Sequence, residues 1–344
     1  MAGCVDDIAL IRSMHTSHSN HYNATLGMHT GSFAFTRPSI GSWVSYGLGT
    51  LNRNLPSFVV IAPKQTYAGT QVYASDFLPG AHQGTFVDSQ HTAVDRLIGN
   101  IRSPHAGPED QRRQLDLLRT LNQAHRRERS DPRLDARLES FELAFRMQAE
   151  ATDAFDTAGE PQHIRDLYGS GVHGRQTLIA RRLLERGVRY VQLWHGAGQP
   201  WDHHDNIEVN HRKLAAEIDQ PIAALLSDLK QRGLLEDTLI VWGGEFGRTT
   251  YSQGKLEPTN HGRDHHGRCF TMWLAGGGVK PGLQFGETDD FCFNVARDPM
   301  HVHDLNATLL HLLGIDHERL TYRAEGRDFR LTDVHGHVVR AVMA

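Results

Sequence analysis

The chain has 344 residues, of which 39% are hydrophobic and 22% are charged, and its formal net charge at pH 7 is −4. This composition is ordinary for a globular protein and excludes disordered, collagen-like and disulfide-scaffold classes, while the charge argues against an electrostatic nucleic-acid binder. The content of 23 histidines is unusually high, and it indicates either metal chemistry or a bias in amino-acid composition.

The N-terminal half predicts one buried strand among several helices. The strand covers residues 57–62, a continuous apolar run that ends at Pro63. Helices are predicted at residues 38–46, 93–97, 108–126 and 131–150. We expect the last two to form a helical insertion over residues 106–160.

From residue 171 the pattern becomes a regular alternation of helices and strands. Helices that end at glycine are predicted at residues 172–186, 210–232 and 303–313. Strands are predicted at residues 189–194, 238–242 and 270–274. The run at 238–242 is continuously apolar, as in a strand covered on both faces. The alternation predicts an α/β fold with a mostly parallel sheet and helices on both faces.

Imidazole and carboxylate groups flank all three of these strands. Ligands of open α/β sheets bind outside the carboxyl ends of the strands, so these groups are expected to meet at one edge. They are Asp202, His203 and His204 after the first strand, Glu245 and Arg248 after the second, and His261, Arg263, Asp264, His265 and His266 before the third.

Imidazoles and carboxylates together are the ligands of zinc, manganese and similar divalent ions, so the cluster predicts a site for one or two metals. A metal there would polarise a phosphoryl or sulfuryl oxygen. The alternative interpretation is that the histidine pairs are solvated loop residues or helix caps. Arg248 and Arg263 are either clamps for an oxyanion or partners in ion pairs between loops.

Several short sequence motifs spread over the chain resemble those of a known family. They include residues 12–16 and 37–43, Trp201-Asp202-x-His204, residues 244–249, 262–265, 273–278 and 301–304, and the segment 322–335. In these motifs the chain resembles the bacterial sulfatase-like family of unknown function, which belongs to the alkaline phosphatase superfamily.

The resemblance implies a single alkaline phosphatase-like domain over residues 1–344, with three α/β/α layers. It implies a divalent metal, zinc, manganese or calcium. The ligands that it implies are Asp202, His204, Glu245 and His265, with Asp264 and His261 as further candidates. Phe246 stands where relatives have a histidine ligand, and His21 stands near the sulfatase nucleophile region as a candidate nucleophile or ligand.

Relatives generally begin with an upstream strand, a Gly-Gly-Pro-Ser-like turn and an aspartate, whereas this chain starts just before Arg12. We therefore expect an N-terminally truncated domain whose first strand is missing. As written, the chain has neither an export signal nor an apolar run of the roughly 20 residues that span a membrane. This predicts a cytoplasmic protein, or a periplasmic or exported one if the true start lies upstream.

Three functions remain open. The first is a metal-dependent hydrolase of phosphate or sulfate esters, with a small anionic substrate that is sulfated or phosphorylated. The second is a non-catalytic protein that binds a metal, an anion or a glycan. The third is a mutase or phosphotransferase, which needs a phosphorylatable residue such as Thr16, Ser17 or Thr30. The chain has an odd number of cysteines, Cys4, Cys269 and Cys292, and they are widely spaced. This pattern indicates no disulfide framework and no zinc ribbon.

Overall fold

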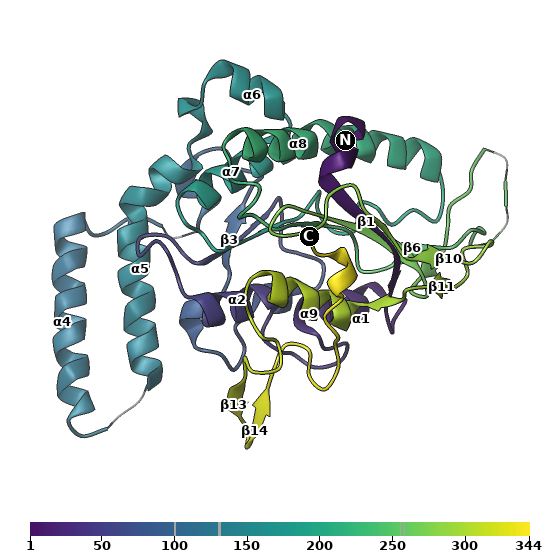
Figure 1. Ribbon diagram of the computed structural model, residues 1–344. Helices are drawn as coiled ribbons and strands as arrows, with labels where there is room; N and C mark the ends of the chain where they lie inside the picture. The colour runs from purple at the N-terminus through teal and green to yellow at the C-terminus, as the bar shows by residue number, and fades with distance from the viewer. Residues whose placement is uncertain (100, 130–131, 255, 258) are drawn as a thin grey trace.

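The computed structural model describes residues 1–99, 101–129, 132–254, 256–257 and 259–344. The strands of its two larger sheets lie in a layer between two layers of helices (Figure 1). One helical layer contains α6 (Gln162–Tyr168), α7 (Val172–Glu185) and α8 (Ile207–Gln231), and the other contains α1 (His21–Thr30), α2 (Ile40–Leu48) and α9 (Val302–Leu312). The structure thus has an α/β architecture with helices on both faces of the strands.

The larger sheet has five strands and is mixed. Its order is β12 (Met300–His301), β1 (Ile8–His15), β8 (Phe270–Ala275) and β5 (Ile240–Trp242), with β9 (Gln284–Phe285) also paired to β1. β1 runs parallel to β12 and β9 but antiparallel to β8, and β8 is antiparallel to β5. The register places Leu10 opposite Trp273.

The smaller sheet contains β3 (Thr85–Asp88), β2 (Phe58–Ala62) and β4 (Tyr190–Leu193), all parallel. The predicted mostly parallel arrangement therefore holds in this sheet and is wrong for the larger one. The reason lies in the connection from β5 to β8, which contains the β6–β7 ladder and no described helix. Antiparallel strands need no helical crossover, whereas parallel strands do.

Most predicted elements are present. The strand at 57–62 is β2, and the strands after residue 171 are β4, β5 and β8. The predicted helices correspond to α2, α3 (Val94–Leu97), α4 (Pro108–Arg126), α5 (Pro132–Phe155), α7, α8 and α9. Asp131, the first residue of the helix predicted at 131–150, lies outside the described residues. Helices α4 and α5 form a hairpin that extends away from the sheets (Figure 1), and within the described part of the chain no helix is long and apolar enough to cross a bilayer.

Strand β1, helices α1 and α6 and the short elements were not predicted from the sequence. Ala9, Ile11 and Met14 of β1 are fully buried, but the strand also contains Arg12 and Ser13, so it does not form a continuous apolar run. The short ladders are β6 (Gly247–Arg248) with β7 (His265–His266), β10 (Glu287–Thr288) with β11 (Val295–Arg297), and β13 (Tyr322–Ala324) with β14 (Arg327–Phe329). Short 3-10 turns lie at Ala2–Asp7, Gly69–Tyr73, Gly80–His82, Thr157–Gly159 and Arg340–Val342.

The core is continuous between β1, β8 and the helices on one side. Ile11 and Met272 are buried together with Leu310 of α9. On the other side of the larger sheet, α8 buries Ile222 against Trp273. Each large apolar side chain buried in this way contributes about 1.5–3 kcal/mol to stability, so this packing fixes the positions of the loops that follow the strands.

Strands β4 and β5 each end a sheet, and each pairs on one side only within the residues that the structure describes. Val241 and Trp242 are 39% and 40% exposed. Because successive side chains of a strand point to opposite faces, the prediction that this strand is covered on both faces is wrong. The predicted loss of a first strand stays a prediction.

The two open edges have a measurable consequence. Amides of β4 and β5 that do not donate within a sheet should exchange with deuterium much faster than those of β2, which has a neighbour on each side. Residue-resolved hydrogen exchange by NMR measures this difference. Equal protection of β5 and β2 would show that another segment or another chain covers the edge.

Candidate metal centre

Three side chains from distant parts of the chain converge at the carboxyl ends of the strands. His21 is the first residue of α1, Asp202 lies in the loop after β4, and His265 lies in β7. One ligand atom from each lies within 4.8 Å of the other two. We refer to these three residues as the His–Asp–His triad.

His21 is oriented by the start of its helix and by a carboxylate. Asn20 caps α1, and its side chain accepts a hydrogen bond from the Tyr22 backbone N–H at 3.1 Å. His21 Nδ1 lies 2.5 Å from Glu245 Oε1. An ionised carboxylate only accepts, so Nδ1 carries a proton, and in a neutral ring Nε2 then holds the lone pair. That Nε2 is buried, has no hydrogen-bond partner and lies 3.1 Å from Asp202 Oδ2.

His265 is oriented in the same way by a backbone carbonyl. Its Nδ1 donates to the Ser19 carbonyl oxygen at 2.8 Å, which in a neutral ring leaves the lone pair on Nε2. Nε2 lies 3.2 Å from both Asp202 Oδ1 and His204 Nε2. Asp264 supports this strand because its Oδ1 accepts a hydrogen bond from the His265 backbone N–H at 2.7 Å.

When both rings are neutral, their Nε2 lone pairs face the Asp202 carboxylate, an arrangement that a bound cation or a proton on a ring would stabilise. Two ligands of a tetrahedral zinc ion with bonds of about 2.1 Å lie about 3.4 Å apart, close to the 3.1–3.2 Å separations around Asp202. His204 Nε2 lies 3.1 Å from Asp202 Oδ1 and is positioned as a fourth nitrogen. The donor set therefore fits a divalent ion.

Phe246 forms an apolar wall beside the triad. Its ring centroid lies 4.7 Å from that of His21 and 4.8 Å from that of His265. By its place in the sequence Phe246 stands where relatives have a ligand. In the structure its ring is instead an apolar neighbour of both imidazoles.

Arg248 neutralises the carboxylate of the triad. Its Nη2 lies 2.6 Å from Asp202 Oδ1. Burial alone would raise the pKa of Asp202, but the hydrogen bond and charge of Arg248 outweigh it and lower this pKa to about 2. Asp202 is consequently ionised at neutral pH and available as a ligand.

Of the other predicted site residues, some contact the triad and some do not. Glu245 contacts it through His21, and Asp264 through the backbone of His265. Arg263 donates to the Thr249 carbonyl oxygen at 3.1 Å, and it lines a neighbouring cavity of about 490 Å³ with His261 and Arg248. His266 points away and contacts the Phe293 carbonyl oxygen at 3.1 Å. Ser19 was missed, because it contributes through its backbone.

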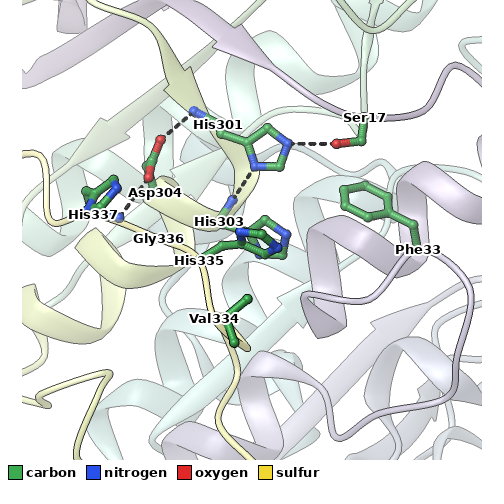
Figure 2. A pocket seen from close by; sticks show the side chains of 9 residues that line it. All are labelled: Ser17, Phe33, His301, His303, Asp304, Val334, His335, Gly336 and His337. Carbon is green, nitrogen blue, oxygen red and sulfur yellow. Dashed lines mark hydrogen bonds between the residues drawn. The ribbon is translucent and has the colours of Figure 1, made fainter.

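A second group of histidines lines a pocket of about 440 Å³ (Figure 2). Ser17, His301 and Asp304 lie together there, but they do not form a catalytic triad. Asp304 accepts from the backbone N–H groups of His301 and His337 rather than from an imidazole. His301 Nδ1 accepts from the His303 backbone N–H, so its ring proton lies on Nε2, which donates to Ser17 Oγ at 3.1 Å. The ring therefore cannot act as a base toward Ser17.

Comparisons with known proteins complete the description. The family described as protein of unknown function (DUF1501) matches residues 1–343, and no curated protein matches the chain. Two similar solved structures are crystal structures of Ps i-CgsB. One, in complex with k-i-k-neocarrahexaose, has 12% identity and a TM-score of 0.43 over 91% of this chain. The other has 13% identity and a TM-score of 0.42 over the same share. This chain spans 65% and 66% of their lengths.

Buried histidines predict how stability depends on pH. Burial lowers the pKa values of His29, His173 and His301 to about 4. The unfolded chain therefore binds more protons below pH 6.5, and the free energy of unfolding should fall as the pH decreases from 6.5 toward 4. Denaturant titrations at pH 7, 6 and 5 measure this fall.

The substitution His301→Asn isolates one contribution. Asparagine preserves the capping of α9 and removes the titrating ring, so the variant should lose less stability between pH 7 and pH 5 than the unmodified chain. Identical pH dependence of the two proteins would contradict the contribution assigned to His301.

Proposed function

We propose that this chain, which belongs to the DUF1501 family of proteins of unknown function, is a metal-dependent hydrolase of phosphate or sulfate esters. One observation carries the proposal. The Nε2 atoms of His21 and His265 both face the carboxylate of Asp202, while their Nδ1 protons are engaged elsewhere. This is the arrangement of metal-binding histidines held by outer partners.

The types of ligand atom in the site distinguish zinc and manganese from calcium. Two imidazoles and one carboxylate, with His204 as an additional nitrogen, favour zinc or manganese. Calcium takes six to eight oxygen ligands, which this group of residues does not offer. We therefore propose zinc or manganese as the ion.

In the proposed reaction the metal, when bound, polarises an ester oxygen and lowers the pKa of water. The residues of the chain do the rest. Glu245 holds His21 in the tautomer that leaves Nε2 free, and Phe246 places an apolar ring beside both imidazoles. Arg248 lies between the triad and the cavity lined by His261 and Arg263. A guanidinium there is placed to hold the anionic group of the substrate.

We also propose that the domain is an alkaline phosphatase-like sandwich of three layers, in which a further strand pairs with β4 or β5. Two features support this proposal. The site residues follow β4 and β5 as ligands follow the strands of open α/β sheets. Each of these two strands also has one edge without a described partner.

A non-catalytic binding protein is the second candidate. It is favoured by the ion pair of Arg248 with Asp202, which occupies one carboxylate oxygen, and by Phe246 at a position where relatives have a ligand. Assays of the metal-loaded chain with aryl phosphates and aryl sulfates separate the two candidates. Metal binding without turnover of either ester class, compared with a metal-free control, would favour the binding protein.

Metal affinity tests the assignment of individual residues. We expect His265→Ala or Asp202→Asn to reduce zinc affinity by more than about 100-fold, because each removes a direct ligand, and Glu245→Gln to reduce it by about 10- to 100-fold at unchanged stoichiometry. Isothermal titration calorimetry measures both quantities.

His261→Ala is the matched control, because this histidine lines the neighbouring cavity rather than the triad. Its zinc affinity should equal that of the unmodified chain. The assignment fails if His261→Ala weakens binding as much as His265→Ala does, or if Asp202→Asn leaves the affinity unchanged.

A further inference from the structure

Two of the three cysteines meet beside β8, in a contact that the metal centre does not use. Cys269 directly precedes β8 and is buried, whereas Cys292 lies in the loop between β10 and β11 and is exposed. The Cys269 thiol donates to the Cys292 carbonyl oxygen, with a distance of 3.1 Å from Sγ to oxygen. Residues 23 positions apart in sequence are thus neighbours in the fold.

The loop that presents Cys292 is held in a defined conformation. The Asp289 carboxylate accepts from the backbone N–H groups of Phe293 at 2.8 Å and Asn294 at 3.0 Å. Cys292 has a φ of 53°, in the left-handed region that residues other than glycine seldom adopt. Such a conformation persists only where the surroundings impose it, and it is more common at functional positions.

The hydrogen bond brings the Cys269 sulfur close to the backbone of Cys292. A backbone oxygen lies about 2.4 Å from its own Cα, so Cys269 Sγ is at most about 5.5 Å from the Cα of Cys292. The Cys292 sulfur itself lies 3.4 Å from Thr288 Oγ1. Bridging therefore requires the Cys292 side chain to turn away from Thr288 and its exposed loop to move until the two Cα atoms lie 4.4–6.8 Å apart, the usual separation in a disulfide.

We propose that Cys269 and Cys292 are a redox-active pair that forms an intramolecular disulfide when the protein meets a peroxide. The Cys292 thiolate attacks one peroxide oxygen, the O–O bond breaks, and the cysteine becomes a sulfenic acid as hydroxide leaves. The Cys269 sulfur then attacks the sulfenic sulfur, the S–O bond breaks, and water leaves with the Cys269 proton. For hydrogen peroxide the two thiols are oxidised, the peroxide is reduced, and two waters form.

The order of these steps follows from the two environments. Cys292 is exposed and accessible to peroxide, while burial, together with the charges of Cys292 and Asp289, raises the pKa of the Cys269 thiol. Cys292 therefore reacts first and Cys269 completes the bridge. The disulfide would tie the β10–β11 ladder to the segment that contains His266, which already contacts Phe293.

Mass spectrometry of the full chain tests this proposal. After treatment with hydrogen peroxide, we expect the loss of two thiols and a mass decrease of about 2 Da per chain, from the two hydrogens removed. Cleavage after Glu287 separates the two cysteines and should yield one cross-linked pair of peptides that reduction releases. Cys4→Ser, the matched control, should behave identically.

The variant Cys269→Ser provides the second readout. It should accumulate a sulfenic acid at Cys292, trapped by dimedone, whereas the unmodified chain should show little of it. Circular dichroism confirms that the variant is folded. Cross-links that involve Cys4, dimers joined through Cys292, or equal sulfenic acid in both proteins would overturn the pairing.

Discussion

The hydrogen bond between His21 and Glu245 is the interaction on which the rest of the site depends. It joins the first residue of α1 to the loop after β5, across 224 positions of the chain, at 2.5 Å. Because it fixes the proton of His21 on Nδ1, it directs the other nitrogen toward Asp202. Without this bond the Nδ1 proton of His21 loses its acceptor, and the ring is held less firmly in the orientation that faces Asp202.

The fold uses histidine in two different ways. In the triad, outer partners hold the Nδ1 sides of both rings and turn the Nε2 sides toward a carboxylate, an arrangement that a bound cation would stabilise. In the pocket of Figure 2, His301 instead uses Nδ1 to cap α9. The large number of histidines therefore has at least two physical causes, and only the first indicates a metal.

Sequence reasoning predicted the local structure well and the long-range structure poorly. Periodicity and glycine stops located α7, α8 and α9, and the positions after β4 and β5 indicated Asp202 and Glu245. The direction of β8 and the central place of β1 depend on pairings between distant segments, which no local pattern encodes. For the same reason the partnership of His21 with Glu245 was invisible: their contact exists only because α1 packs beside the ends of the strands.

The central claim is that a divalent ion binds between the imidazoles of His21 and His265 and the carboxylate of Asp202. X-ray absorption spectroscopy of the zinc-loaded chain tests it most directly. The account predicts a first shell of nitrogen and oxygen at about 2.0–2.1 Å, with the outer-shell scattering of at least two imidazoles. It also predicts that this imidazole scattering decreases in His21→Ala. A shell of oxygen alone, or a spectrum that the substitution leaves unchanged, would contradict it.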